Sequence, residues 1–382
     1  MDAAQWDALV DATPGTTVFQ RHAWLLALQA SDCAVPATGW QALVLRLYDA
    51  AGGLAAGCVV YAKGHSMGEY VFDWAWADAH ERAGLDYYPK LLLATPFTPV
   101  TGARLLARND AARRALLQAL LRLARGTGVS SLHLLFLTEP EREACEQAGL
   151  LLRTTVQFHW RQAAEPWADF EAFVAAMNHD KRKKIRQERR KVQQSGVVLR
   201  RLHGAAIDRA AWRLFTRCYE RTYAEHGSMP YLNLEFFERV GSTLPEHLLL
   251  IVASLDGEDI ACSLIMLDPA LRRAYGRYWG ALRHVPLLHF ELCYYQPLEF
   301  CLEQGYELFE GGAQGSHKMA RGLLPVACTS AHWVADTRLR AAIAAHLGRE
   351  NPLMEQHLDE LQRHAPMRRD DASSRAAPAE VM

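Results

Sequence analysis

Apolar residues follow helical spacing in some stretches of the first half of the chain and form strand-like runs in others. Helical spacing predicts helices, whereas alternation or a short apolar run predicts a strand. Gly52 and Gly53 separate two such runs, which indicates a hairpin. Residues 87–99 contain three prolines, which favour strand ends or loops over a central strand. The elements predicted for this half are helices over 3–11, 20–31, 111–125 and 140–148, and strands over 43–48, 54–61, 132–137 and 151–160.

The second half shows the same mixture of helical and strand patterns. Gly196 is expected to end a helix, and Asp256-Gly257 signals a hairpin. From Asn351 the periodicity weakens, and segment 367–382 has a composition typical of disorder. The elements predicted here are helices over 167–177, 181–191, 208–225, 233–244, 287–303 and one ending near 349, and strands over 197–202, 248–255, 260–267, 273–280, 306–310 and 329–334.

Both halves contain paired apolar strands, an aromatic segment, a long helix and a last strand, which indicates an internal duplication of structure. A chain of 382 residues is long enough for two domains with cores of their own. We therefore predict an α/β fold with a mixed α+β sheet. The expected domains cover residues 1–160 and 161–350, and a C-terminal helix with a disordered tail covers 351–382.

Composition and charge narrow the class of protein. Half of the residues are apolar and 22% are charged, which is typical of a globular chain. Because 42 basic residues face 43 acidic ones, any contact with a polyanion has to be local. The eight cysteines form no CxxC pair, which favours reduced thiols and gives neither a disulfide frame nor a metal site. We find no signal peptide and no long apolar window, so we expect a cytoplasmic protein without a membrane span.

Segment 63–78, KGHSMGEYVFDWAWAD, combines aromatic and polar residues in a loop-like order. Core packing is the favoured interpretation for its four large aromatic residues, Tyr70, Phe72, Trp74 and Trp76. The alternative is a groove wall that includes Trp74. In that case the polar contacts would come from Lys63, His65, Glu69 and Asp73.

Segment 181–191, KRKKIRQERRK, contains eight basic residues and one glutamate. Ile185 and Val192 lie seven residues apart, so the segment can pack as a helix along a thin apolar seam. One interpretation is a solvated helix face. The other is a phosphate-binding element that uses Lys183, Lys184 and Arg186, since aligned cations neutralise polyanions.

Segment 274–325 is the part of the chain with the most candidate chemistry. A strand, a covering helix and a second, parallel strand lead into the loop Gly311-Gly312-Ala313-Gln314-Gly315-Ser316-His317-Lys318. Open α/β sheets form ligand crevices at the C-terminal ends of such strands. We therefore expect one site, in the second half or in the cleft between the halves, because the first half lacks a comparable loop.

Several long motifs together resemble the bacterial FemAB-like subgroup of the Fem-type acyltransferases, often labelled as peptidoglycan biosynthesis or recognition proteins. They are KGHSMGEYVFDWAWADA, YYPKLLLATPFTPVTGARLL, GRYWG, HFELCYYQPLEF and FEGGAQGSHKMARGLLP, and NHDKRKKIRQERRKVQQSGV is similar to the basic helix that opens the second Fem domain. The resemblance covers roughly residues 5–350. It implies tandem acetyltransferase-type (GNAT) folds.

The resemblance also implies transfer of an acyl or aminoacyl group to an amine of a small molecule or peptide. The donors used across the superfamily are acyl-CoA and aminoacyl-tRNA, so tRNA is a possible partner, and no cofactor is expected to stay bound. The sequence departs from the GNAT pyrophosphate loop, because Gln314 and Gly315 lie in a glycine-rich loop of another shape. The alternative function is a non-catalytic module that binds a peptide, a muropeptide or RNA.

Direct aminolysis needs a proton acceptor and donors aimed at the oxyanion, but no covalent nucleophile. Glu291 is the first candidate base, although it could simply complement the N-terminus of its helix. His289 and His317 are alternatives, because histidine titrates near operating pH. We find no GxSxG motif and no cysteine in an activating context, which argues against an acyl-enzyme.

Two further pairs of residues are candidate contacts for a donor. Lys318 and Arg321 lie three residues apart after the glycine loop and could bind phosphate or be ordinary surface charge. Arg277 and Trp279 share a face of the preceding strand, where they could stack or bind an anion. Core packing is the competing interpretation for Trp279.

Overall fold

The computed structural model describes residues 2–313 and 315–367 of the chain. Its contacts divide the chain into two compact units. The first comprises residues 1–156, 231–236 and 327–357, and the second comprises 157–230, 237–326 and the segment from 358 onward. The division falls inside four elements, β6, α9, β12 and α12.

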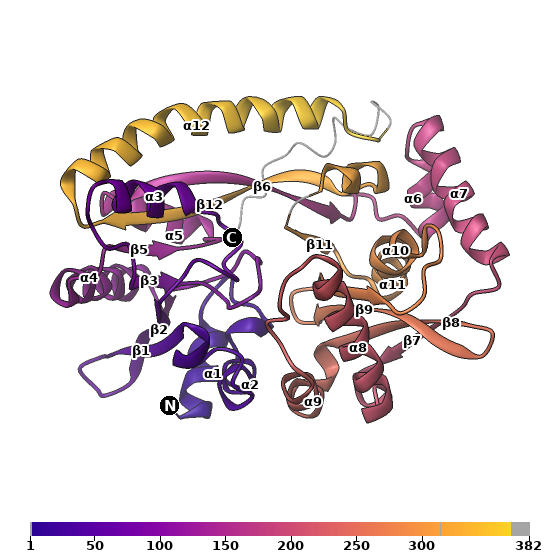
Figure 1. Cartoon of the computed structure of the whole chain (residues 1–382), viewed down its shortest axis with the longest axis horizontal. Coiled ribbons are helices and arrows are strands. Elements are labelled where there is room, and N and C mark those ends of the chain that lie inside the picture. The colour runs from indigo at the N-terminus through magenta and orange to yellow at the C-terminus, as the bar shows by residue number, and fades with distance from the viewer. Residues whose placement is uncertain (1, 314, 368–382) are drawn as a thin grey trace. The chain divides into compact units, whose positions relative to one another are not determined.

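The first unit contains a mixed sheet with helices on both faces (Figure 1). Its elements are α1 (Ala3–Ala12), α2 (His22–Ala30), β1 (Trp40–Tyr48), β2 (Leu54–Lys63), α3 (Trp74–Arg82), β3 (Lys90–Leu93), β4 (Leu106–Ala107), α4 (Asp110–Thr127), β5 (Ser131–Leu134), α5 (Glu139–Gln147) and the parts of β12 (Leu324–Val334) and α12 (Thr337–Arg363) that lie within 327–357.

The strand order in the first unit is β1-β2-β3-β5-β12, and β4 pairs with β2. β3 and β5 run parallel, with α4 as the crossover helix, and the other pairs are antiparallel. Alternate residues of β2 face opposite sides, as a strand requires. Cys58 belongs to the core under α4, whereas Val59 packs with the cluster around Trp6 of α1.

The second unit has a sheet of its own. Its elements are the end of β6 (Leu151–Arg161), α6 (Phe170–Ala175), α7 (His179–Gln194), β7 (Val198–His203), α8 (Arg209–Glu225), α9 (Leu234–Thr243), β8 (Leu248–Leu255), β9 (Glu258–Asp268), β10 (Arg273–Ala281), α10 (Leu288–Phe290), the π-helical turn η5 (Glu291–Tyr295), α11 (Gln296–Gln304), β11 (Leu308–Ala313) and the 3-10 turn η6 (Ser316–Arg321).

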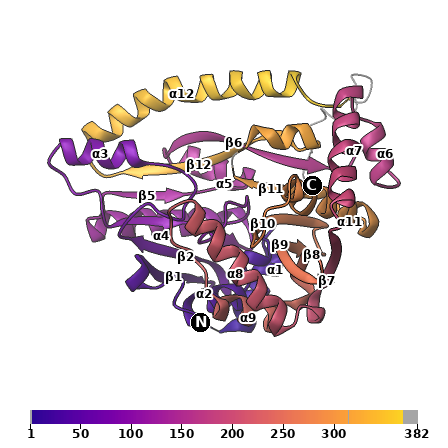
Figure 2. The same cartoon turned by 45° about the vertical axis from the view of Figure 1, so that its right-hand side comes forward.

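The strand order in the second unit is β7-β8-β9-β10-β11, followed by the end of β6. β10 and β11 run parallel and the other pairs are antiparallel. Helices cover both faces of this sheet. Cys262 of β9 contacts Cys218 of α8, whereas the next residue, Ser263, contacts Cys293 of η5. Figure 2 shows α8 crossing in front of β9 and β10.

The two units repeat one pattern of strand pairing. The order β1-β2-β3-β5-β12 and the order β8-β9-β10-β11-β6 both read antiparallel, antiparallel, parallel and antiparallel. This agrees with the duplication expected from the sequence. Each closing strand, however, comes from the other half of the chain. Residues 327–350, expected in the second domain, are therefore counted with the first unit.

Three sequence expectations are wrong. β3 is a central strand between β2 and β5, because Pro89 and Pro96 lie outside Lys90–Leu93 and leave its backbone donors intact. Part of the segment expected as a loop is helical, since α3 begins at Trp74. The last helix does not end near residue 349 but continues through Pro352 to Arg363. Residues 368–382, expected to be disordered, lie outside the described residues.

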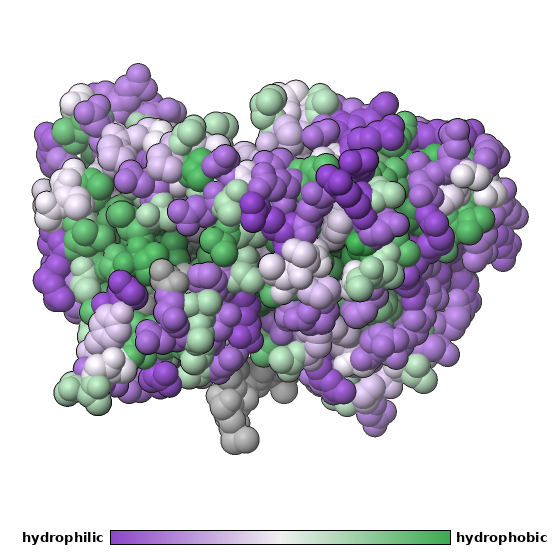
Figure 3. Space-filling model, turned by 90° about the horizontal axis from the view of Figure 1, so that it is seen from below, coloured by the Kyte–Doolittle hydropathy of each residue, from purple (hydrophilic) through white to green (hydrophobic). Residues whose placement is uncertain are grey.

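The surface of the first unit has an apolar area. Seen from below, apolar residues gather on the left side of the view, where Figure 1 places β1 and β2 (Figure 3). The edge strand β1 exposes Leu43, Val44 and Tyr48. Within the described part of the chain, no helix combines the length and apolar character needed to cross a membrane.

Candidate active site

The end of the parallel strand pair in the second unit carries several irregular backbone features. The β10–β11 ladder joins Arg273–Leu308, Ala274–Phe309 and Tyr275–Glu310, and both strands then continue beyond it. β10 bulges at Arg277, and the following helix contains the π-helical turn Glu291–Tyr295. Bulges and π-turns are enriched beside functional sites, so this end of the sheet is the candidate location.

His317 of η6 presents an exposed imidazole at this end of the sheet. Its Nε2 lies 3.1 Å from the hydroxyl oxygen of Tyr294. Its ring lies 6.2 Å from that of Phe290. Gly315 has φ of 104°, and a Cβ there would lie 2.6 Å from Cε1 of His317. A glycine is therefore required for the ring to lie against the loop.

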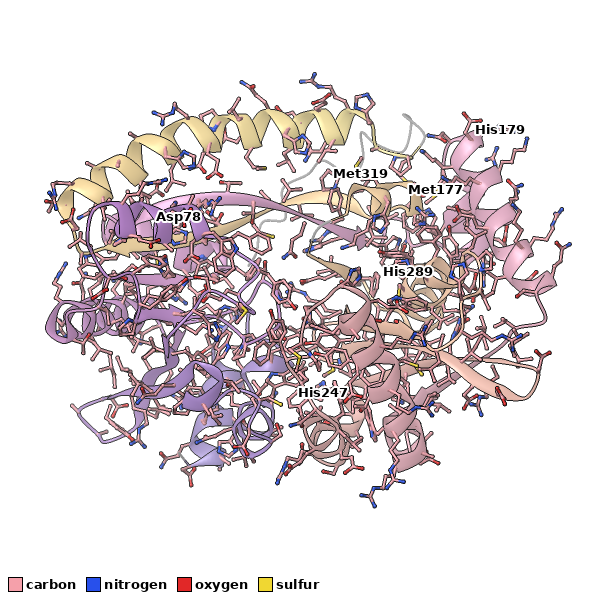
Figure 4. All side chains as sticks on the ribbon, viewed as in Figure 1. Asp78, Met177, His179, His247, His289 and Met319 are labelled. Atoms are coloured by element: carbon pink, nitrogen blue, oxygen red, sulfur yellow. The ribbon has the colours of Figure 1, made fainter. Side chains whose placement is uncertain are left out.

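His289 is a half-buried residue of α10 (Figure 4). Its ring centroid is 6.4 Å from that of His317 and 5.0 Å from that of Trp279. Burial, with His317 and the cations of Arg321 and Lys318, lowers the pKa of His289 to about 4. Burial and the same two cations also lower the pKa of His317 below its usual 6.5. Both imidazoles are therefore neutral at pH 7 and able to accept protons.

Lys318 and Arg321 both point inward. Lys318 is buried, and its Nζ donates to the carbonyl oxygen of Gly312 at 2.9 Å. Burial lowers the pKa of Lys318 to about 8. Arg321 is 3% exposed and forms an ion pair with Glu188, 3.0 Å between Nη2 and Oε2. Both cations are buried and make contacts within the protein. They are therefore not ordinary surface charge, which was one of the two expected interpretations.

Glu291 is enclosed by partners. The side chain is buried, with the residue 3% exposed, and Oε1 accepts from Nη2 of Arg189 at 3.0 Å and from Nε2 of Gln296 at 2.9 Å. Arg189 also pairs with Glu299. A general base has to reach the proton that it removes. These contacts favour a structural role for Glu291 and make His317 the better candidate base.

Arg277 and Trp279 of β10 are both half-buried. The Arg277 guanidinium lies 4.8 Å from the ring centroid of Tyr278 and donates to its hydroxyl at 3.1 Å. Trp279 packs edge-on against His289. These contacts join Arg277 and Trp279 to different aromatic rings, and the expected stacked or anion-binding pair stays a prediction.

The basic segment forms α7, capped by Asn178, whose side chain accepts from the backbone amide of Lys181 at 3.1 Å. The apolar seam predicted from Ile185 and Val192 is confirmed, since both are buried. Figure 4 shows His179 at the first turn of the helix. The three expected polyanion contacts, Lys183, Lys184 and Arg186, are exposed. Arg186 also forms an ion pair with Glu171 at 2.8 Å.

The polar residues singled out in segment 63–78 lie in the first unit, and most of them are buried. Lys90 of β3 donates to Glu69 at 2.8 Å and pairs with Asp73, so these two acids form a buried cluster and no groove wall. His65 is half-buried, with Nε2 3.0 Å from the carbonyl oxygen of Thr38.

The aromatic residues of the same segment differ in burial. Only Trp76 among the four is fully in the core, while Trp74 is 47% exposed and Phe72 is 51% exposed. The interpretation of this segment as core packing is therefore wrong for Trp74 and Phe72.

Sequence reasoning missed several residues that shape the candidate site. Tyr294 and Phe290 lie in the motif HFELCYYQPLEF, but their contacts with His317 depend on a turn 23 residues or more away in sequence. Glu188 and Arg189 lie in the segment with eight basic residues and one glutamate, and neither was among its expected phosphate contacts. The lone acid in that segment was the available signal.

One proposed contact, Gln314, lies outside the described residues. Within the described part of the chain, no group of three or more His, Cys, Asp or Glu side chains could hold a metal ion.

Residues 1–369 match the FemAB-like family model, described as peptidoglycan biosynthesis/recognition. The chain therefore belongs to the FemAB-like family, as its motifs indicated, and the α/β prediction is confirmed. Among curated proteins, none matches this sequence.

Solved structures share the fold at low identity. L-PGS from Bacillus licheniformis has a TM-score of 0.53 and 10% identity over 90% of this chain and 96% of that one. The C-terminal domain of a putative lysylphosphatidylglycerol synthetase from Agrobacterium fabrum has a TM-score of 0.51 and 11% identity over 89% of this chain and 96% of that one. A conserved protein of unknown function from Bacteroides thetaiotaomicron has a TM-score of 0.51 and 10% identity over 88% of this chain and 98% of that one.

Proposed function

We propose that the chain transfers an acyl or aminoacyl group from an activated donor to an amine. The observation that carries the proposal is the exposed His317 imidazole at the end of β11, with Nε2 3.1 Å from the Tyr294 hydroxyl. Membership of the FemAB-like family supports the same class of reaction. His317 is the proposed proton acceptor, and the side chains of Tyr294 and His289 lie next to its ring.

The reaction requires no covalent intermediate on the protein. The amine nitrogen attacks the carbonyl carbon of the thioester or ester, a C–N bond forms, and the bond to sulfur or oxygen breaks. His317 accepts the proton that the amine loses and returns it to the leaving group. A neutral imidazole is needed for the first step, which agrees with the lowered pKa of His317.

Aminoacyl-tRNA and acyl-CoA are the two proposed donors. The exposed cations of α7 favour a donor with many phosphates. The name of the family favours an amine of a peptidoglycan-precursor peptide as the acceptor. The similar structure from Agrobacterium fabrum is named a putative lysylphosphatidylglycerol synthetase, which supports an aminoacyl group.

A non-catalytic binding module is the second candidate. The exposed side chains of Phe72 and Trp74 favour it, because exposed aromatic rings stack on sugars or bases. The two candidates differ in turnover: only a transferase releases a product that carries the acyl group.

The test uses the full chain with labelled acetyl-CoA or a labelled aminoacyl-tRNA mixture and a precursor peptide that carries a free amine. His317→Gln is expected to lower kcat by about 100-fold, since general bases contribute about 10²–10⁴. His284→Gln, at an exposed histidine in the same unit, is the matched control. Equal turnover by His317→Gln and the parent would remove His317 from the mechanism.

The donor is identified by its dependence on salt. If α7 binds tRNA, the double reversal Lys183→Glu/Lys184→Glu is expected to weaken binding and to flatten its salt dependence. Arg122→Glu/Arg125→Glu reverses two exposed cations of α4 and is the control. Equal salt slopes for all three proteins would exclude α7 as the phosphate contact.

A further inference from the structure

Glu188 is the one acid in the basic segment, and it faces the interior of the second unit. It is 6% exposed, and both of its oxygens accept from Nη2 of Arg321, at 3.1 Å and 3.0 Å. The Tyr295 hydroxyl also donates to it. A buried carboxylate that accepts from one guanidinium nitrogen and from a phenol is well satisfied, so its position is strongly defined.

The other arm of Arg321 reaches the backbone of the candidate base. Nη1 donates to the carbonyl oxygen of His317 at 2.9 Å. The guanidinium carbon lies 3.4 Å from the ring centroid of Phe290, whose ring lies beside that of His317. One side chain therefore contacts both the backbone that carries the imidazole and an aromatic ring beside it.

We propose that Glu188 and Arg321 are positioning residues that hold His317 in its reactive orientation. Glu188 fixes the guanidinium through α7, and the guanidinium fixes η6 and Phe290. Neither residue is exposed enough to receive the proton itself, since both are less than one-tenth exposed. This inference rests on the proposed function only for the identity of the step that His317 performs.

The charged and titratable groups that face His317 are Tyr294 and His289 from the helix and Lys318 and Arg321 from its own segment. Removing the Arg321 cation is therefore expected to raise the pKa of His317. The remaining cation, Lys318, is held by Gly312 and stays in place.

The experiment measures His317 directly. Histidine side chains labelled at Cε1 are titrated by NMR in the parent and in Arg321→Gln, and His317→Gln assigns the signal. Arg321→Gln is expected to raise the pKa of His317 by about half a unit or more, because a neighbouring cation disfavours the charged form. It is also expected to broaden the signal. The rate kcat is expected to fall about tenfold, with KM within about twofold.

Arg321→Lys separates position from charge. Lysine keeps the cation but cannot donate in a planar fork to Glu188 and to the His317 carbonyl. We expect it to restore most of the pKa and little of kcat. Arg221→Gln removes an exposed ion pair with Glu225 in α8 of the same unit and is the control.

Each outcome decides one question. If the parent transfers no acyl group, the proposed function fails, and the NMR titration alone decides the positioning role. If the parent is active and Arg321→Gln has the same His317 signal, the same His317 pKa and the same kcat as the parent, the positioning role is overturned. If Arg321→Gln does not fold by circular dichroism, Glu188→Gln/Arg321→Gln, which removes both charges together, carries the same test.

Discussion

Lys90 lies at the centre of a buried charged cluster in the first unit, and Lys90→Met is expected to destabilise that unit strongly. The lysine is 0% exposed, and its Nζ donates to Glu69 and to Ser66, each at 2.8 Å. It also pairs with Asp73, which accepts from the Tyr87 hydroxyl at 2.6 Å. Methionine keeps an unbranched stem and removes the terminal ammonium group, with its charge and its donors.

The magnitude follows from the two acids that would lose their cation. Removing one partner of a buried ion pair costs about 3–5 kcal/mol, because the other charge stays buried without compensation. Burial opposes ionisation of Asp73, but Lys90, His133 and the hydrogen bonds from Lys90 and Ser66 together hold the pKa of Asp73 below its usual value. Burial raises the pKa of Glu69 to about 7 even with Lys90 present. We therefore expect a loss of at least about 3 kcal/mol at pH 8.

The loss is expected to depend on pH. Without Lys90, the folded-state pKa of Asp73 should rise above its unfolded value. A group shifted in this direction stabilises the fold below its unfolded pKa, and that stability is lost as pH rises through the folded pKa. The gap between variant and parent should therefore be widest at pH 8 and narrower at pH 5.

Urea unfolding followed by circular dichroism at both pH values measures the effect. Lys191→Met, at an exposed lysine of α7, is the control, with an expected change within about 0.5 kcal/mol. Glu69→Gln/Asp73→Asn/Lys90→Met removes three charges of the cluster and should recover much of the loss, since replacing buried ion-pair partners together is often near neutral. A Lys90→Met protein as stable as Lys191→Met at pH 8 would refute the reasoning.

Three further predictions test other parts of the structure. Gly280→Ala should cost about 3 kcal/mol or prevent folding, because its Cβ would lie 1.9 Å from the carbonyl oxygen of Cys218; thermal unfolding measures it, and a stable variant would contradict the close packing of β10 on α8. Asn178→Ala should cost about 1 kcal/mol through loss of the α7 cap, measured by urea unfolding, with Asn178→Asp as the capping control. The transfer rate should be constant near pH 7 and fall as pH drops through the His317 pKa, below 6.5, because protonation removes the base; an unchanged acid limb in His317→Gln would contradict this assignment.

The local elements were largely predictable from the sequence, whereas the pairing of distant strands was not. The spacing of apolar residues and the turn residues predict whether a segment forms a helix or a strand and which face it buries. Ile185 and Val192, both buried in α7, are an example. The same patterns do not predict the partner of a segment. β12 pairs with β5 and β6 with β11, across about 200 and 150 residues, and no local pattern encodes either choice. The expected domain limits therefore followed chain order, whereas the compact units do not.

The sequence predicted the location of the candidate site better than it predicted the roles of the individual residues. The glycine loop after β11 pointed to His317, because glycine-rich segments at strand ends allow close approach of side chains and ligands. The role of Glu291 was not predictable. Its partner Arg189 lies 102 residues earlier in a segment whose charge indicated solvent contact. Long-range ion pairs of this kind depend on tertiary packing, which a helical period does not contain.

The repeat of strand pairing explains why we place the proposed site in the second unit. The segment that follows β5 is apolar and buried at Leu135, Phe136 and Leu137. The segment at the equivalent position after β11 contains glycines and the exposed His317.

Several titratable groups of the first unit are buried and contact one another. His133 and His332, for example, lie with their Nδ1 atoms 2.7 Å apart, and burial lowers the pKa of His133 to about 3. Such groups stabilise a fold but cannot meet a substrate without breaking their own contacts. The same pairing of strands thus gives a polar core in one unit and an accessible imidazole in the other.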